Sequence, residues 1–574
     1  TQQYKSLLSP FKINDLEFKN RILLAPMGDN LCNEDGSISK KQERYFLARA
    51  RGGCAGIILG SVGVSRPSGQ ATPMELSLAD DSLIEKYEAF SNLMHAEDCK
   101  VIAQIKHGGS KAAYAASIGV PFLVPTLKDM SPEDIEHGKN MVGKLTSDEM
   151  AAFVSNLKGA GNFKVMEKND IEIVIEQFKQ AAKRAFEAKL DGVEIHAGHG
   201  YVISSFLSKA TNQRTDEYGG SLKNRMRLLV KIIDAIRLEL PRSFPIIVRL
   251  DGEEINIKNG LTSSESIQIA KSIESKVDAI HVSSYANPAS GADFTKAPLN
   301  HKKEGFIKVT SLIQAAVKIP IIAVGRIDPD RADDYISQGK FNFLAMGRKL
   351  LADPDLPKKL MKNEPKKIKP CHYSYECVSR IFLNGQMVCA SDVGLGKKEK
   401  EHSIKNLAII GAGPAGLELA VQAANRKIHV SLYEKQSFIG GNLIGAAIIY
   451  EPYEKLLNYY QESIKNDFID VHFNKEIELD DLHDKFFDNQ MLVLASGALL
   501  GPSRVNATNI QAWLNPFIHE NKGNVKLIKS SIKEKEIGDC AIIGTDTIQL
   551  HLASFLTSLG INISLVKNAD DIGG

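Results

Sequence analysis

One short segment of the chain combines side chains that could polarise and protonate a substrate: His196, His199 and Tyr201, separated by small residues. Paired imidazoles can donate hydrogen bonds to a carbonyl or nitro oxygen and so stabilise the negative charge that develops there. The Tyr201 hydroxyl can deliver a proton if it reaches the substrate. Metal binding by the two histidines is the competing interpretation, and it lacks a further ligand at the usual spacing.

Two glycine–arginine pairs, Gly325-Arg326 and Gly347-Arg348, each follow a short apolar run. Glycine allows close backbone approach, and a guanidinium can hold a phosphate through paired hydrogen bonds. Two arginines engaged in surface ion pairs are the alternative. The matched pattern favours a phosphate-bearing cofactor.

A further arginine, Arg249, ends the apolar run 245–250, and Gln104 lies in another apolar run. A buried guanidinium requires an anionic or well-oriented polar partner. An amide that both donates and accepts suits the pyrimidine edge of a flavin, and an arginine near N1 would favour the reduced ring. Taken alone, either residue would more often be structural.

The elements that must position these side chains alternate between strands and amphipathic helices, which is the pattern of βα units. Eight apolar runs are the number that closes a TIM barrel, in which chemistry lies at the carboxyl ends of the strands. Helices are expected at 171–188, 222–240 and 263–275, and the long connection 126–169 is expected to be functional, disordered or separately structured. The expected strands are Arg21–Met27, Ala55–Val62, Lys100–Lys106, Gly192–His196, Pro245–Leu250, Ala279–Val282, Ile319–Val324 and Phe343–Met346.

A second glycine pattern follows the apolar run 405–410, where Gly411, Gly413 and Gly416 open a helix. About twenty residues later another strand ends in Glu434, where an acid can bind a ribose hydroxyl. The glycines would let the backbone approach a pyrophosphate at the helix N-terminus. Strand, glycines, helix and acid together form a strong dinucleotide fingerprint.

A later segment repeats only part of that fingerprint. The strand-like run 540–543 is followed by Gly544, but Asp546 and Gln549 occupy the positions of the later glycines. An acid there would repel a pyrophosphate. The sequence therefore predicts a partial, degenerate nucleotide domain, either because the chain is a fragment or because this half has decayed.

Three of the seven cysteines, Cys371, Cys377 and Cys389, lie within nineteen residues, and Ser374 stands midway between the first two. Thiolates are the preferred ligands of iron–sulfur clusters, whereas a serine alkoxide is a harder, more basic donor. Three cysteines can hold a three-iron cluster, or a four-iron cluster whose remaining iron binds Ser374 or solvent. An altered cluster, no cluster and another metal are the open alternatives.

The composition is that of a soluble globular protein of two or three domains, with 574 residues, 43% hydrophobic and 24% charged. A net charge of +2 gives no indication of binding to nucleic acid or to an anionic membrane. No apolar run reaches the length of a membrane span, and the N-terminus lacks the apolar core of a secretory signal. Sparse cysteines outside 371–389 argue for a reducing cytoplasm.

The barrel half resembles the old yellow enzyme superfamily of NADH:flavin oxidoreductases. The matching segments are 19–27, 196–201 and 206–225, together with both glycine–arginine pairs. The resemblance implies FMN at the barrel mouth, with His196 and His199 on the substrate oxygen and Tyr201 as the proton donor. The implied FMN-binding residues are Ala25, Pro26, Met27, Gly28, Gly60, Gln104, Arg249, Gly325, Arg326, Gly347 and Arg348.

One position departs from the family pattern. Many relatives have threonine or cysteine where this chain has Gly28. That side chain normally touches the flavin edge, and in amine-dehydrogenase relatives the cysteine binds flavin covalently. Noncovalent FMN is therefore expected.

The whole layout resembles the branch that contains 2,4-dienoyl-CoA reductase and trimethylamine dehydrogenase. It implies a TIM barrel at 1–368, an iron–sulfur segment at 369–400, a Rossmann-like FAD domain at 401–500 and a partial NAD(P)-binding domain at 501–574. NAD(P)H is the implied electron donor. The implied FAD-binding residues are Gly411, Gly413, Gly416, Glu434 and Gly441, and the implied ligands of a [4Fe–4S] or altered cluster are Cys371, Ser374, Cys377 and Cys389.

The leading functional hypothesis is an FMN ene-reductase that reduces the activated C=C bond of an enone or enoyl-type substrate. An amine dehydrogenase or N-demethylase of the same branch, and a degenerate barrel retained for binding, are the alternatives. The expected partners are a small-molecule substrate and either a second copy of the chain or a separate reductase.

Overall fold

The computed structural model describes residues 3–127, 161–286, 303–398, 403–478, 481, 491–497, 510–534, 540–543 and 547–566. The chain divides into two compact units. Unit 1 comprises Thr1–Asn363 and Tyr373–Lys398, and unit 2 comprises Glu364–His372 and Glu399–Gly574. Among these described residues, every helix is too short or too polar to cross a membrane.

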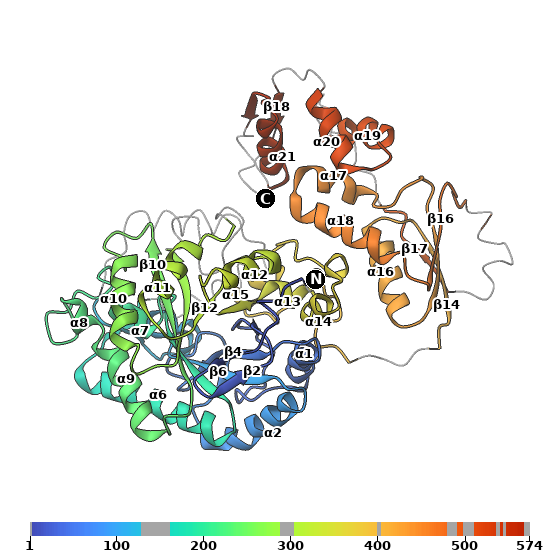
Figure 1. The fold of residues 1–574 in the computed structure, drawn as a ribbon. Helices are drawn as coiled ribbons and strands as arrows, with labels where there is room; N and C mark the ends of the chain where they lie inside the picture. Colours follow the sequence, from blue (N-terminus) through green and yellow to red (C-terminus); the bar gives the residue numbers. More distant parts are fainter. Residues whose placement is uncertain are drawn as a thin grey trace. The chain divides into compact units, whose positions relative to one another are not determined.

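Unit 1 is built on parallel strands that close into a barrel surrounded by helices (Figure 1). Strand β3 pairs with β13 on one side and with β4 on the other, which closes the ring. The predicted TIM barrel is confirmed, and each predicted strand is present with shifts only at its ends. The strands are β3 (Ile22–Leu24), β4 (Gly56–Gly63), β6 (Lys100–Lys106), β9 (Gly192–Ala197), β10 (Ile246–Ile255), β11 (Ala279–Ala286), β12 (Ile321–Ala323) and β13 (Phe343–Met346).

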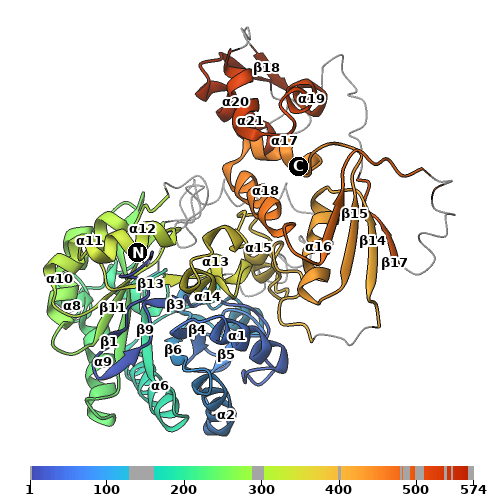
Figure 2. The same ribbon diagram turned by 45° about the vertical axis from the view of Figure 1, so that its right-hand side comes forward.

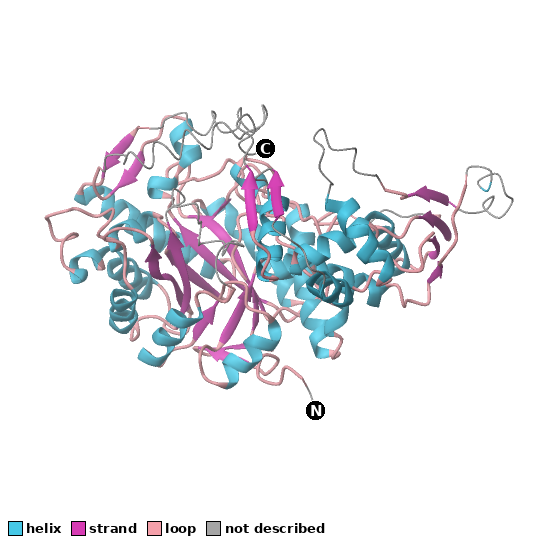
Figure 3. Ribbon diagram, turned by 90° about the horizontal axis from the view of Figure 1, so that it is seen from above, coloured by secondary structure: helices cyan, strands magenta, loops and turns pink. Residues whose placement is uncertain are grey.

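Amphipathic helices cover the outside of the barrel, seen in Figure 3 as cyan helices around magenta strands. Helix α6 (Lys168–Glu187) buries Ile171, Val174 and Phe178, whose spacing places them on one face. The predicted helix 222–240 is divided into two. The helices are α1 (Lys40–Arg51), α2 (Ile84–His95), α3 (Ala113–Ser117), α6, α7 (Val202–Leu207), α8 (Leu222–Arg225), α9 (Arg227–Glu239), α10 (Ser263–Ile273), α11 (Ile307–Ala316), α12 (Pro329–Ser337), α13 (Arg348–Ala352), α14 (Leu356–Met361) and α15 (Glu376–Phe382).

A hairpin of β1 (Phe11–Ile13) and β2 (Leu16–Phe18) closes the amino-terminal end of the barrel. Phe18 is fully buried, and its ring lies 5.2 Å from that of Phe343 in an edge-to-face arrangement. Asn14 has a left-handed φ of 54° at the turn, a conformation that asparagine tolerates. The sequence analysis did not predict this hairpin.

The long connection predicted at 126–169 contains β8 (Phe163–Val165), which pairs in parallel with β7 (Phe122–Val124) just before it. The rings of Phe122 and Phe163 stack at 5.1 Å and join the two strands. Residues 128–160 lie outside the described part of the chain. A further short strand, β5 (Leu76–Ser77), pairs with the end of β4.

Unit 2 contains a parallel four-stranded sheet in the order β16-β15-β14-β17. This is the order of a doubly wound nucleotide-binding fold, in which the ligand binds where the strand order reverses. Figure 2 shows α16 against this sheet. The elements are β14 (Asn406–Ile410), α16 (Pro414–Asn425), β15 (His429–Tyr433), α17 (Asn442–Ile449), α18 (Glu451–Ser463), β16 (Ile469–His472), β17 (Met491–Leu494), α19 (Ile510–Glu520) and α20 (Val525–Glu534).

The predicted strand 540–543 is β18 (Cys540–Ile543), which pairs in parallel with β19 (Ile563–Val566). Helix α21 (Thr547–Ser558) connects the two strands. Gly544 and Asp546 lie outside the described residues, so the predicted weakness of this nucleotide site stays a prediction. The predicted boundaries at 368, 400 and 500 also stay predictions.

Replacing Phe18 with alanine should lower the free energy of unfolding of unit 1 by about 3–5 kcal/mol, because it leaves a cavity where the hairpin meets the barrel strands. Phe11→Ala is the matched control, since Phe11 is partly exposed on the same hairpin. Denaturant unfolding of both variants measures the difference. Equal losses would show that the hairpin does not seal the barrel.

Candidate active site at the barrel mouth

A chain of buried polar side chains crosses neighbouring barrel strands. Gln104 Nε2 donates to Glu194 Oε1 at 2.7 Å, and Glu194 Oε2 lies 2.8 Å from His281 Nδ1. Arg249 Nη1 lies 3.0 Å from His281 Nε2. Burial raises the pKa of Glu194, but His281 and Arg249 outweigh burial and lower it. Glu194 is therefore the anion that balances the buried guanidinium.

A second group of polar side chains links Arg249 to the loop 196–201, which follows β9. Arg249 Nε donates to Ser283 Oγ at 3.1 Å, and Ser283 Oγ donates to Asp251 Oδ1 at 3.2 Å. His199 Nε2 lies 2.8 Å from the same Ser283 Oγ, and the His199 backbone N–H donates to Asp251 Oδ2 at 2.6 Å. Burial raises the pKa of Asp251 to about 7. The Asp251 carboxyl group, which supports the loop 196–201, thus titrates near neutral pH.

The loop after β9 carries the three predicted catalytic residues. The His196 ring centroid lies 4.8 Å from that of His199 and 4.8 Å from that of Tyr201. The Gly198 backbone N–H donates to His196 Nδ1 at 3.3 Å, so the ring proton lies on Nε2. Burial lowers the pKa of both histidines well below the ordinary value. Both imidazoles are therefore neutral at pH 7 and supply hydrogen bonds without charge.

A buried ion pair lies beside Tyr201. Lys106 Nζ lies 2.9 Å from Glu75 Oε1, and both side chains are almost fully buried. The same ammonium nitrogen is 5.1 Å from the centre of the Tyr201 ring. A cation over the face of an aromatic ring is attracted by its π electrons, so this contact helps to position the Tyr201 ring. The sequence alone did not reveal this pair, although Lys106 ends an apolar strand.

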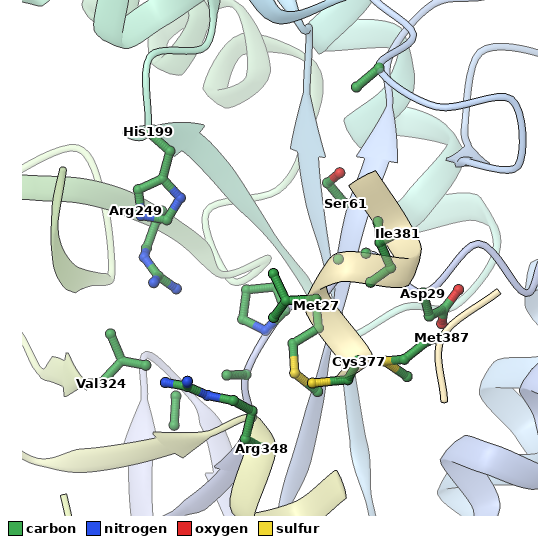
Figure 4. Close-up of a pocket in the computed structure, with 18 of the residues that line it drawn as sticks. Met27, Asp29, Ser61, His199, Arg249, Val324, Arg348, Cys377, Ile381 and Met387 are labelled. Carbon is green, nitrogen blue, oxygen red and sulfur yellow. The ribbon is translucent and has the colours of Figure 1, made fainter. Parts of the chain in front are cut away.

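The carboxyl ends of the strands surround a cavity of about 460 Å³ that lies within unit 1. Figure 4 shows His199, Arg249 and Arg348 on its wall, together with Met27 and Cys377. Gln104 and His196 are buried but do not line it. The predicted residues that do line it are Ala25, Pro26, Met27, Gly28, Gly60, His199, Tyr201, Arg249, Gly325, Arg326, Gly347 and Arg348.

The lining suits FMN because backbone approaches the cavity closely at glycines and because guanidinium groups are available for a phosphate. A Cβ atom added at Gly28 would meet nothing within 4 Å, whereas one at Gly60 would lie 2.2 Å from Pro26 Cβ. A Cβ atom at Gly347 would lie 2.8 Å from Met27 Sδ. Backbone therefore forms part of the wall, and Arg326 and Arg348 add the guanidinium groups that suit a phosphate.

Two tyrosines from the cysteine segment cover these arginines. The Tyr373 ring centre lies 5.3 Å from Arg326 Cζ and 5.0 Å from Arg348 Cζ. The Tyr375 ring centre lies 5.1 Å from Arg348 Cζ. Through these cation–π contacts, the residues directly before and after Ser374 pack against the arginines of the predicted phosphate site.

The predicted iron–sulfur ligands are divided between the two units. Cys371 belongs to unit 2, whereas Ser374, Cys377 and Cys389 belong to unit 1. All three cysteines are partly exposed, and within the described residues none of them forms a disulfide. Within the described ranges, no group of three or more His, Cys, Asp and Glu side chains is arranged to hold a metal ion. The cluster stays a prediction.

The dinucleotide fingerprint of unit 2 has the expected geometry. Gly411 has a φ of 106°, and a Cβ atom there would lie 2.4 Å from the Ala495 carbonyl oxygen. A Cβ atom at Gly413 would meet nothing within 4 Å, and one at Gly441 would lie 3.2 Å from Gly413 Cα. Glu434 Oε2 accepts from the Ala412 N–H at 2.9 Å. Gly416 packs against Gly411, so helix α16 begins close to the glycine turn.

The barrel with its flavin-shaped cavity, followed by a doubly wound nucleotide-binding sheet, defines a flavin-dependent oxidoreductase. The family described as NADH:flavin oxidoreductase / NADH oxidase matches residues 6–367, and the chain belongs to this family. The family of pyridine nucleotide-disulphide oxidoreductases matches residues 405–573. The matches confirm the predicted resemblance and support FMN in the barrel and FAD or NAD(P) binding in unit 2.

Three relatives cover nearly the whole chain. An NADH oxidase from Thermoanaerobacter brockii is 30% identical, over 99% of this chain and 84% of its own length. A cinnamate reductase from Clostridium sporogenes is 28% identical, over the same shares of both chains. The structure of a 2-naphthoyl-CoA reductase complex matches with a TM-score of 0.82 and 26% identity, over 98% of this chain and 83% of that one.

The raised pKa of Asp251 predicts a pH-dependent stability. Between its unfolded value of 3.8 and its folded value of about 7, the folded protein holds a proton that the unfolded chain has released. This group therefore lowers stability as pH rises, by up to about 1.4 kcal/mol per pH unit. Asp251→Asn removes the effect, so its melting temperature relative to the native chain should rise from pH 5 to pH 7. A constant difference would contradict the raised pKa.

Breaking the buried pair by Lys106→Met should cost about 3–5 kcal/mol of unfolding free energy, because Glu75 would be left as an unbalanced buried charge. Adding Glu75→Gln should restore much of that loss. The control is Lys231→Met, which removes an exposed ion pair to Glu172 and should cost at most about 1 kcal/mol. Denaturant titration of the three variants gives these values.

Proposed function

We propose that the protein is an FMN-dependent ene-reductase that reduces the activated C=C bond of an enone or enoyl-type substrate. The observation that carries this proposal is the loop 196–201, which brings a neutral imidazole and a phenol to the wall of the flavin-shaped cavity. Two relatives, a cinnamate reductase and a 2-naphthoyl-CoA reductase, support a reductive function.

Bound FMN would supply hydride to the substrate carbon that lies two bonds from the activating carbonyl. A hydrogen bond from His199, which lines the cavity, would hold the carbonyl oxygen, where negative charge gathers, and His196 would support the loop from behind. The Tyr201 hydroxyl would give its proton to the carbon next to the carbonyl, and solvent would restore it. The contact of the Lys106 ammonium with the Tyr201 ring would help to hold the phenol in position for that transfer.

Three arginines would bind the flavin and its phosphate. Arg249 is buried and balanced by Glu194, so it can place a positive charge beside the ring and favour its reduced form. Arg326 and Arg348 would hold the phosphate. We further propose that NAD(P)H delivers electrons through unit 2, whose glycine turn suits a dinucleotide.

The test uses anaerobically purified protein, with FMN, FAD, iron and sulfide measured per chain. Flavin reduced with dithionite is mixed with benzylideneacetone, an enone, and its reoxidation is followed by absorbance. The proposal expects rapid reoxidation and the saturated ketone as product. Bleaching of the oxidised flavin by methylated amines, with no reaction of the enone, would instead establish amine dehydrogenation.

Tyr201→Phe should slow reoxidation by benzylideneacetone by about 100- to 10,000-fold, because proton delivery to carbon is lost. Ferricyanide is the control oxidant, since it takes electrons without forming a C–H bond. An equal loss with both oxidants would mean that the substitution damaged the flavin site. A normal rate with the enone would exclude Tyr201 as the proton donor.

A further inference from the structure

The hydroxyl group of Ser283 lies among three polar side chains. Its Oγ atom lies 3.1 Å from Arg249 Nε, 2.8 Å from His199 Nε2 and 3.2 Å from Asp251 Oδ1. A serine hydroxyl has one hydrogen to donate and two lone pairs that accept. The arginine can only donate, so it takes one of the lone pairs. Of the histidine and the aspartate, one must therefore donate to Ser283 and the other must accept from it.

The charge on Asp251 decides which of the two donates. An ionised carboxylate only accepts, so it takes the Ser283 hydrogen, and His199 must carry its ring hydrogen on Nε2. When the carboxyl group is protonated, Oδ2 already accepts from the His199 backbone N–H at 2.6 Å, so the proton belongs on Oδ1. Oδ1 then donates to Ser283, and Ser283 donates to His199 Nε2. In this second arrangement the ring hydrogen of His199 lies on Nδ1.

Nδ1 is the ring nitrogen of His199 that remains for a ligand. Nε2 is engaged by Ser283, and within the described ranges no hydrogen bond reaches Nδ1. The His199 side chain lines the cavity and is partly exposed there (Figure 4). A substrate carbonyl oxygen accepts a hydrogen bond and cannot donate one. Only the arrangement with hydrogen on Nδ1 can therefore hold that oxygen.

The backbone keeps these side chains in contact. His199 has a left-handed φ of 63°, which costs free energy for a residue with a side chain, and its N–H is bonded to Asp251 in this conformation. A Cβ atom at Gly198 would lie 2.8 Å from Asp251 Oδ1, so the carboxyl group fits because position 198 is glycine. Ser266 Oγ donates to the Asp251 carbonyl oxygen at 2.8 Å and fixes that end of β10.

The surroundings of Asp251 place its titration near neutral pH. Burial raises its pKa to about 7, while the His199 N–H and Arg249 lower it and Glu254 raises it. Burial lowers the pKa of His199 well below its ordinary value, so the ring is neutral in both arrangements. Helix α11 presents the apolar Val309 to this segment. The polar groups around the aspartate and the histidine are Arg249 and Glu254 on β10, Glu194 and His196 on β9, Lys111 after β6, His281 and Ser283 on β11, and Ser266 on α10.

Building on the proposed ene-reductase function, we propose that Asp251 and Ser283 are positioning residues that form a relay and set the tautomer of His199. When Asp251 holds a proton, the ring presents an Nδ1–H donor to the substrate oxygen. When Asp251 is ionised, the ring hydrogen lies on Nε2 and Nδ1 cannot donate. The change releases one proton from the carboxyl group to solvent, while Ser283 and His199 each keep one hydrogen.

Benzylideneacetone tests the relay, because its ketone needs a donor and does not ionise. The second-order rate constant for reoxidation of the dithionite-reduced holoenzyme is measured from pH 6 to pH 9. In the native chain it should fall about 100-fold across this range, because the protonated fraction of Asp251 falls tenfold for each pH unit above about 7. A rate constant that does not fall would overturn the proposal.

Two substitutions separate the relay from other titrating groups. Asp251→Asn keeps an acceptor for the His199 N–H and a donor for Ser283 at every pH, so its rate constant should remain high at pH 9. Ser283→Ala disconnects the ring from the carboxyl group, so its rate constant should be lower than the native value at pH 6 but independent of pH. A native-like fall with pH in either variant would contradict the relay.

Glu254→Gln is the matched control, because Glu254 is a second, partly buried carboxylate whose Oε2 accepts from Ser208 Oγ and the Leu261 N–H. Its rate constant should still fall with pH. The midpoint of the fall should move to lower pH, because Glu254 raises the pKa of Asp251. Loss of the fall in this variant would assign the pH dependence to Glu254 and overturn the relay.

A spectroscopic measurement reads the tautomer without turnover. The holoenzyme is prepared with isotope-labelled histidine, and long-range proton–nitrogen correlation spectra distinguish hydrogen on Nδ1 from hydrogen on Nε2. His199→Gln assigns the signal by its loss. The native His199 ring should carry its hydrogen on Nδ1 at pH 6 and on Nε2 at pH 9. In Asp251→Asn the hydrogen should lie on Nδ1 at both values.

The outcomes distinguish the two proposals. If benzylideneacetone does not reoxidise the flavin while the tautomer still changes with pH, the ene-reductase function fails and the control of His199 by Asp251 stands. If the enone is reduced while the ring keeps one tautomer at both pH values, the relay fails and the ene-reductase function stands. FMN content shows whether each variant has folded. Ser283→Thr keeps the hydroxyl group and should retain the fall with pH, so it decides the matter if Ser283→Ala has not folded.

Discussion

The barrel of this protein depends on balancing one buried arginine. Arg249 lies at the centre of the strands that carry the site, and Glu194 is the carboxylate that offsets its charge. His281 lies between them, and Gln104 completes the line. Leaving a buried charge without its partner costs several kcal/mol, so each strand must present the right residue inward. A shift of one residue would turn that residue to the other face.

The need to balance buried charge also explains why the histidines are neutral while other side chains carry the positive charge. The histidines are buried so deeply that they are neutral, which suits them to donate hydrogen bonds. Positive charge is supplied instead by side chains on neighbouring strands, such as Arg249 and Lys106. The barrel fixes the distance of each cation from the loop 196–201. Asp251 and Ser283 join the two systems, because both contact His199 while Ser283 also accepts from Arg249. The loop 196–201 and Arg249 therefore share one hydrogen-bonded support.

Much of the barrel and of its candidate site could be predicted from sequence. Apolar runs mark the barrel strands, and the residues at the carboxyl ends of these strands must meet at one rim. His199, Tyr201, Arg249 and both glycine–arginine pairs are at the cavity as predicted. Partners within strands escaped prediction because Glu194 and His281 are far apart in the chain and look like isolated polar residues in apolar runs. Their pairing follows from strand register, which a single sequence does not reveal.

Other features were not predicted, either because their local sequence signals are weak or because they depend on contacts between distant loops. The hairpin 11–18 is marked only by an Asn-Asp turn between two short runs. The Lys106–Glu75 pair joins segments separated by a whole βα unit. The division of the cysteine segment, with Cys371 in one unit and Cys377 in the other, follows from packing rather than spacing. The spacing of the cysteines predicts which residues could bind a cluster, but it does not predict the unit to which each residue belongs.

Tyr373 and Tyr375 have a thermodynamic consequence for the segment that carries Ser374 and Cys377. A guanidinium binds an aromatic ring through its face and an anion through its N–H edge, so Arg326 and Arg348 can hold both at once. A phosphate bound to the arginines would also favour their contacts with the two tyrosine rings, and linkage makes such an effect reciprocal. Cofactor binding would then make local opening of the segment that carries Ser374 and Cys377 rarer as the cofactor concentration rises.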